Sequence, residues 1–192
     1  MGYSFFAFIA RMRYISRWGL MRNTEQENIQ EHSHMVAVLA HALAVIRRDV
    51  FHQEADPERA ATAALYHDAP EIFTGDLPTP VKYFNPELRT AYREVEAVSA
   101  QRLLSMLPEE LRGSYTHLLH EETDSATRTL VKAADKLSAH IKCLEELKAG
   151  NREFQQAASQ TRAAVDALAL PEAEYFIEHF LPAFGLTLDE LE

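Results

Sequence analysis

The sequence predicts an all-α protein, and three observations support that class. Glycine is scarce, at 6 of 192 residues, while alanine, leucine, glutamate and arginine, which favour helices, are abundant. Apolar residues recur at the three- and four-residue spacing of a helix face. No five-residue stretch alternates convincingly between apolar and polar residues, as a half-buried strand would. With 47% hydrophobic residues, the chain can bury one sizeable core, so we expect a single domain over residues 1–192.

The first half of the chain contains three expected helices. Apolar residues at helical spacing predict a helix between residues 5 and 15 and a second one with a stripe from residue 36 to 46. Asp56 and Pro57 form an N-cap and first-turn pair, which opens a third helix that reaches His67.

The second half repeats the same signals. Asn85 and Pro86 form another cap and first-turn pair, which opens a helix that reaches about Met106. Further apolar stripes predict helices over residues 130–144, 154–165 and 175–180. Gly150 is placed where a C-terminal cap would end the first of these.

The composition argues against several classes of function. A formal net charge of −10 does not suit a general nucleic-acid binder, which needs clustered lysine and arginine for phosphate contacts. The single cysteine, Cys143, has no partner for an internal disulfide and suits a reducing compartment such as the cytoplasm. The longest uncharged apolar stretch, residues 35–46, is far shorter than the roughly 20 residues that span a bilayer.

The first 23 residues differ from the rest because they carry four arginines and no acidic residue. Such a start also resembles a mitochondrial transit peptide. Its sparse serine, and its continuation into SRWGLMRN rather than a cleavage site, favour a structured segment instead.

Four polar side chains lie on or beside apolar helix faces, where an unpaired charge is costly to bury. His32 comes one turn before the stripe of the second helix, His67 and Asp68 end the third, and Asp135 interrupts the 130–144 stripe. Two imidazoles and two carboxylates suit manganese, cobalt, iron or zinc better than calcium. Because helical bundles build metal sites from facing helices, we expect these four residues to converge on one divalent metal ion.

A proline-rich segment follows the histidine and aspartate pair. Residues 74–86 read TGDLPTPVKYFNP and predict a stiff, extended loop of the kind that positions ligands. Just before it, Pro70 is incompatible with an uninterrupted helix because it lacks an N–H group. Two interpretations stay open: the helix ends or kinks there and directs Glu71 into the site, or Pro70 begins a new turn whose dipole favours ionised Glu71.

The order H…HD…D, with these intervals, resembles the HD-domain metal-dependent phosphohydrolases. More narrowly, the segments SRWGLMRN, ENIQEHSHMVA, YHDAPEIFTGDLPTPVKYFN and KAADKLSAHIKCLEELKAGN are similar to the bacterial 5′-deoxynucleotidase family. The similarity runs from Arg11 to the terminal LTLDEL. It implies an HD-domain helical bundle, a homodimer, and hydrolysis of deoxyribonucleoside 5′-monophosphates, without a nucleic-acid or membrane partner.

The resemblance also implies roles for individual residues. The family's metal ligands match His32, His67, Asp68 and Asp135. Glu71 matches its catalytic carboxylate, and Arg17 matches the residue that orients the phosphate. The remaining substrate contacts that the family implies are Trp18, Asp68, Asp76, Leu77, Pro78 and Thr79.

Two positions depart from the family's pattern. Gly19 stands where the family has proline, and Pro70 stands where it has serine. We expect Gly19 to loosen the turn that carries Arg17 and Trp18 and so to affect substrate selection.

The chemistry of a phosphate monoester suggests a mechanism for these residues. Its dianion repels a nucleophile, and a bound divalent metal both neutralises charge and lowers the pKa of water to as low as about 7. Under this hypothesis Glu71 orients the attacking water or protonates the leaving 5′-oxygen, while Arg17 clamps phosphate oxygens. Trp18 would leave no room for a 2′-hydroxyl.

Three other interpretations are compatible with parts of the sequence. The chain could be a nucleotide-sensing module that binds without turnover, although Glu71 and Arg17 are both present. It could hydrolyse a triphosphate or a cyclic nucleotide, but these substrates call for more basic residues or a second metal. A purely structural helical domain would leave the four predicted ligands scattered.

Overall fold

The computed structural model describes residues 2–82, 84–119 and 124–191, with the backbone but not the side chain of Thr79. Within these ranges the chain is helical, no residue lies in a β-strand, and one isolated antiparallel bridge joins Ser16 to Asn28. The α-helices are α1 (Phe5–Ile9), α2 (Ile29–Val45), α3 (Pro57–Tyr66), α4 (Glu71–Thr74), α5 (Thr79–Lys82), α6 (Pro86–Ser105), α7 (Glu109–Leu119), α8 (Ser125–Lys148), α9 (Gln155–Asp166) and α10 (Pro171–His179). Short 3₁₀ or π-helical turns are η1 (Ala10–Tyr14), η2 (Ile46–Val50), η3 (Arg152–Phe154), η4 (Leu181–Gly185) and η5 (Leu188–Glu190). The all-α prediction is confirmed.

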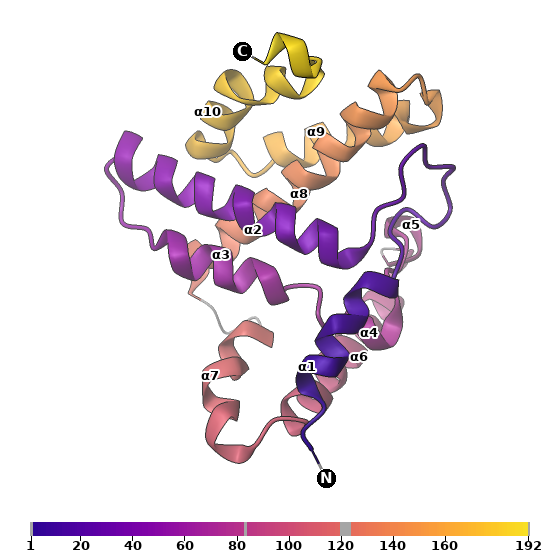
Figure 1. Cartoon of the computed structure of the whole chain (residues 1–192), viewed down its shortest axis with the longest axis vertical. Helices are drawn as coiled ribbons and strands as arrows, with labels where there is room; N and C mark the ends of the chain where they lie inside the picture. Colours follow the sequence, from indigo (N-terminus) through magenta and orange to yellow (C-terminus); the bar gives the residue numbers. More distant parts are fainter. Residues whose placement is uncertain (1, 83, 120–123, 192) are drawn as a thin grey trace.

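Three long helices form the centre of the molecule. Helix α2 packs against α3 and α8, and α3 also contacts α8 (Figure 1). Helices α9 and α10 lie at one end of this centre, and α1, α6 and α7 lie at the other. The site described below uses residues from all three central helices.

Helix α2 joins the two main apolar clusters of the protein. Its first residue, Ile29, is buried in a cluster with residues of α1, α6 and α7. The buried residues among 36–44 of the same helix, such as Val36, Leu39 and Leu43, belong to the larger cluster, to which α3, α8, α9 and α10 also contribute. His32 lies on α2 between these two stretches, so the packing on both sides fixes its position.

The caps predicted from the sequence are present. Asp56 and Asn85 each accept a hydrogen bond from a backbone N–H in the first turn of α3 and α6. Helix α2 begins with a further cap that was not predicted, a capping box formed by Asn28 and Glu31. Helix α8 ends before Gly150, whose positive φ of 86° suits glycine.

Two parts of the fold differ from the expectations. Helix α7 was not predicted: its sequence EELRGSYTHLL contains Gly113, a poor helix former, although Leu111, Tyr115 and Leu118 recur at helical spacing. The prediction of a fully extended loop at residues 74–86 was wrong in part, since α5 forms a helical turn there. Pro80 lies in the first turn of α5, where its missing N–H would have no helical partner in any case.

A search for membrane-spanning segments gives no candidate among the described residues. No helix there combines the required length with the required hydropathy.

Candidate metal and phosphate site

The structure brings the four predicted ligands together. One atom each from His32, His67 and Asp135 lies within 4.8 Å of the other two. Oδ2 of Asp68 is 3.1 Å from Nε2 of His67 and 3.6 Å from Nε2 of His32. Bonds of about 2 Å to a single ion hold ligand atoms no more than about 4 Å apart, so the cluster is close to the required size.

The end of α3 orients His67. This residue caps the helix, and its Nδ1–H donates to the carbonyl of Ala64 at 2.7 Å. In the neutral ring the lone pair is then on Nε2, which is buried 3.1 Å from Oδ2 of Asp68 and has no hydrogen-bond partner of normal geometry among the described residues. A buried imidazole nitrogen in this state is costly unless a cation binds it, which is the behaviour of a metal ligand.

His32 is fully buried, and both of its ring nitrogens have neighbours. Nε2 lies 3.1 Å from Oδ1 of Asp135. Nδ1 lies 3.1 Å from the hydroxyl of Ser138 and 2.8 Å from Nη1 of Arg17. If Nε2 binds a metal, Nδ1 must carry the proton. Ser138 can accept it, whereas Arg17 is itself a donor and must then move away from its 2.8 Å contact with Nδ1.

The predicted ligands influence one another's ionisation because they are buried together. Burial opposes the charged form of His67, but Asp68 and Asp135 outweigh it and raise the pKa of His67 to about 9. Burial likewise opposes ionisation of the two carboxyls, yet His67 and His32 hold the pKa of both below the usual range. A bound metal cation would replace the imidazolium proton of His67 as a partner of these carboxylates.

Glu71 lies beside the cluster, at the start of a new helix. Helix α3 ends at Tyr66 and α4 begins at Glu71 with Pro70 as its N-cap, so the chain both breaks and restarts here. One of the two interpretations of Pro70 was that the new turn keeps Glu71 ionised. With only the charged groups of the protein around it, this interpretation was wrong. Burial first, and then the charges of Asp68 and Asp76, raise the pKa of Glu71 to about 10. Its Oε2 is buried without a hydrogen-bond partner among the described residues.

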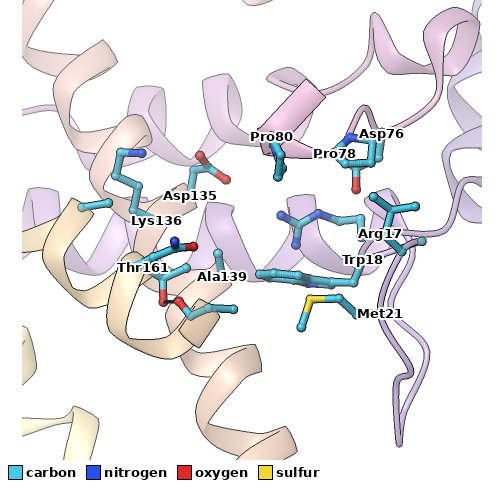
Figure 2. Close-up of a pocket in the computed structure, with 15 residues that line it drawn as sticks. Arg17, Trp18, Met21, Asp76, Pro78, Pro80, Asp135, Lys136, Ala139 and Thr161 are labelled. Carbon is cyan, nitrogen blue, oxygen red and sulfur yellow. Dashed lines mark hydrogen bonds between the residues drawn. The ribbon is translucent and has the colours of Figure 1, made fainter. Parts of the chain in front are cut away.

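A cavity of about 370 Å³ opens beside the cluster. Its walls include the predicted residues Arg17, Trp18, Asp76, Pro78 and Asp135 (Figure 2). The side chain of Asp135 is 38% exposed whereas that of His32 is fully buried, so the cluster is open on the α8 side. Leu77 and Glu71 are not among the lining residues, and the side chain of Thr79 lies outside the described residues.

Trp18 separates this cavity from an apolar cluster. Its ring centroid is 5.3 Å from that of Phe154, and the guanidinium carbon of Arg17 is 5.8 Å from the ring centroid. Figure 2 shows Arg17 extended above the indole, with its guanidinium directed toward Asp135. Packing and cavity lining are therefore both functions of this tryptophan.

Several lining residues were missed by the sequence analysis. They include Met21, Lys136, Ala139, Gln160 and Ala164. Most are small or apolar and lie on α8 and α9, where they resemble ordinary helix-packing positions, so no local signal marks them. Lys136 carried one available signal, because it directly follows a predicted ligand on α8.

Gly19 also lines the cavity, but the backbone does not require glycine there. Its φ is not in the left-handed region, and a Cβ at this position would have no heavy atom within 4 Å.

The helical fold and the histidine and aspartate cluster define the class of the protein, an HD-domain phosphohydrolase. An HD-domain phosphohydrolase from Listeria innocua superimposes with a TM-score of 0.83 and 27% identity, over 96% of this chain and 90% of the other.

Sequence relatives narrow this class. The model of the YfbR-like 5′-deoxynucleotidase family matches residues 4–184. The 5′-deoxynucleotidase of Vibrio cholerae is 50% identical over 188 residues, which cover 97% of both chains. The 5′-deoxynucleotidase YfbR of Escherichia coli is 48% identical over 97% of this chain and 94% of its own. The chain therefore belongs to the YfbR-like 5′-deoxynucleotidase family.

Proposed function

We propose that this chain hydrolyses deoxyribonucleoside 5′-monophosphates to a deoxyribonucleoside and phosphate with one divalent metal ion. The observation that carries the proposal is the joint placement of a metal-sized cluster and a basic, aromatic cavity wall. Ligand atoms of His32, His67 and Asp135 lie within 4.8 Å of one another, and Arg17 and Trp18 line the cavity that Asp135 borders. The names of the family relatives describe the same activity.

We assign the metal to His32, His67, Asp68 and Asp135. The mixed nitrogen and oxygen set suits manganese, cobalt, iron or zinc. Nε2 of His67, which has no hydrogen bond of normal geometry within the described residues, and the two adjacent carboxylates support a cation at this point. When bound, such an ion neutralises phosphate charge and lowers the pKa of water.

The protein's own groups supply binding and proton transfer. Arg17 binds phosphate oxygens, for which its planar guanidinium is suited. Glu71 handles the proton at the attacking water or at the leaving 5′-oxygen. The burial that raises its pKa favours the protonated form, which donates to the 5′-oxygen as the bond breaks.

The cavity wall selects the nucleoside. Trp18 leaves no space or partner for a 2′-hydroxyl, and Asp76 and Pro78 line the same cavity. Leu77 and Thr79 belong to the same segment and are assigned to the substrate from the family's pattern. The small residues of α8 and α9 leave room for the base at the other end of the cavity.

Three broader features are also proposals. Residues 1–192 form one domain. Two copies of the chain form a homodimer, which exposed apolar side chains near the C-terminus, such as Phe180 and Leu188, support. The enzyme works in the cytoplasm, where its single cysteine, Cys143, stays reduced.

A phosphate-release assay tests the activity. The protein is stripped with a chelator, resupplied with manganese, cobalt or zinc, and given dAMP, AMP, dATP or cyclic AMP. We expect metal-dependent phosphate release from dAMP well above that from AMP. Binding of dAMP without release would support a sensing module, and preference for dATP or cyclic AMP would support one of the other hydrolases.

A further inference from the structure

Glu27 contacts both residues that are proposed to hold the substrate. It lies in the segment before α2, and its side chain is 15% exposed. Oε2 accepts a hydrogen bond from Nη1 of Arg17 at 2.6 Å and another from Nε1 of Trp18 at 3.1 Å. A single carboxylate oxygen therefore joins the guanidinium to the indole.

The backbone reinforces this connection. The N–H of Arg17 donates to the carbonyl of Glu27 at 2.9 Å, next to the bridge between Ser16 and Asn28. Because Asn28 is the N-cap of α2, Glu27 is tied to the same helix that carries His32. The contact thus relates Arg17 and Trp18 to the metal cluster.

Arg17 needs such a partner because other carboxylates compete for it. Asp135, Asp68 and Asp76 all attract its charge in addition to Glu27. Without Glu27, the guanidinium keeps its 2.8 Å contact with Nδ1 of His32 but loses the carboxylate that holds it away from the cluster. The carboxylates of the cluster would then attract it, and it would compete with a metal instead of binding phosphate.

Trp18 needs a second point of attachment for a different reason. Its φ of 59° lies in the left-handed region, which aromatic residues rarely adopt. Its carbonyl accepts from the N–H of Met21 at 2.9 Å, but this bond does not act on the ring, which packs against Phe154. The bond from Nε1 to Glu27 is the polar contact that fixes the orientation of the ring.

We infer that Glu27 is a positioning residue that holds Arg17 and Trp18 as one unit and so couples phosphate orientation to rejection of the 2′-hydroxyl. This inference rests on the function proposed above. Loss of Glu27 should lower turnover and also reduce discrimination between deoxyribose and ribose.

The test compares Glu27→Ala and Glu27→Gln with the matched control Glu25→Gln. Glu25 is in the same segment, and its side chain is exposed. Trp18 is the only tryptophan, so intrinsic fluorescence reports on its surroundings without any need for activity. The second measurement is kcat/KM for dAMP and for AMP.

We expect Glu27→Ala to shift the emission to longer wavelength, to lower kcat/KM for dAMP about tenfold or more, and to lower the ratio of dAMP to AMP activity. Glu27→Gln keeps an oxygen for Trp18 but loses the charge that holds Arg17. It should therefore retain the emission and the ratio while kcat/KM falls. Glu25→Gln should match the wild type in all three.

If Glu27→Ala has the tryptophan emission of the wild type and the same ratio of dAMP to AMP activity, the inference is overturned. If circular dichroism shows that this variant does not fold, unchanged kcat/KM in Glu27→Gln would overturn it instead. Failure of the wild type to release phosphate from dAMP would refute the proposed function, while the emission comparison would still decide whether Glu27 positions Trp18.

Discussion

Nε2 of His32 lies 3.1 Å from Oδ1 of Asp135, although 103 residues separate them in the chain. The contact joins α2 to α8. Asp68, which follows the end of α3, lies close to the same nitrogen of His32. Two carboxylates in this small space repel each other unless a cation lies between them. Metal binding should therefore stabilise the packing of the three central helices as well as support turnover.

This relationship predicts that the metal stabilises the fold through Asp135. Addition of metal at 100 times its Kd should raise the free energy of unfolding by about 2.7 kcal/mol. Asp135→Ala should lose most of this gain and most of the bound metal. Thermal unfolding and elemental analysis measure the two effects. Asp49→Asn, at an exposed pair with Arg48, serves as the control and should keep both.

Ser138 should influence metal affinity through His32. Its hydroxyl is the acceptor that the metal-binding tautomer of His32 requires, so Ser138→Ala should weaken metal binding by about 10- to 100-fold. Ser33→Ala is the matched control, because the Ser33 hydroxyl is buried next to His32 without a hydrogen-bond partner among the described residues. Competition with a chromogenic chelator measures both affinities. Equal affinities in the two variants would count against this role.

The parts of the fold that local patterns determine could be predicted. Helices with a clear apolar stripe or with a cap followed by proline begin and end near the expected residues, as Asp56 and Asn85 show. The local signal for helix α7 is weaker. It contains Gly113, and its contacts with α3 and α6 depend on tertiary packing.

In the site, too, residues marked by a local pattern could be predicted, whereas residues whose role depends on tertiary contacts could not. The predicted ligands could be recognised because a polar residue on an apolar helix face requires a partner. Ser138 could have been found by helical spacing, since it lies three residues after Asp135 and so on nearly the same face. Glu27 could not, because its importance depends on how a loop without periodicity brings it to Arg17 and Trp18.

Glu71 should affect turnover much more than metal binding. Glu71→Gln keeps the size of the side chain but removes the proton donor or acceptor, so kcat for dAMP should fall by about 100-fold or more. Metal content should stay close to that of the wild type, because Glu71 is not among the assigned ligands. Parallel measurement of phosphate release and bound metal checks both points. Undiminished kcat would remove Glu71 from the mechanism.

A buried ion pair fixes the loop that carries Glu27. Glu146 on α8 is 1% exposed, pairs with Lys142, and accepts hydrogen bonds from the backbone of Thr24 and Glu25. Burial opposes the charge, but Lys142 and the other donors lower the pKa of Glu146 to about 2. Glu146→Gln should lower the free energy of unfolding at pH 7 by about 3 kcal/mol, since Lys142 loses its ion-pair partner and keeps only neutral acceptors such as the carbonyl of Glu25.

The pH dependence of this effect has a definite sign. The folded pKa of Glu146 is below its ordinary value of 4.5, so its contribution is complete above that value and is lost as pH falls toward 2. The difference between Glu146→Gln and the wild type should therefore shrink between pH 5 and pH 3 in urea unfolding. Burial raises the pKa of its neighbour Glu145, so Glu145→Gln should be neutral or stabilising at pH 7. A pH-independent difference for Glu146→Gln would refute this interpretation.

Gly19 and Gly75 offer a matched pair that tests whether glycine is needed in the substrate loops. Gly19 has open space where a Cβ would lie, and its φ is not left-handed. Gly19→Ala should therefore raise the free energy of unfolding by about 0.4 to 1 kcal/mol, because alanine lowers the conformational entropy of the unfolded chain. Gly75 has a φ of 71°, so Gly75→Ala should destabilise by about 1 kcal/mol or more despite similar open space. Because a stiffer turn at Gly19 restrains Arg17 and Trp18, Gly19→Ala should also maintain or increase the ratio of dAMP to AMP activity. Chemical unfolding and the two kcat/KM values measure these effects, and a lower ratio in a stabilised variant would show that selection depends on mobility of this turn.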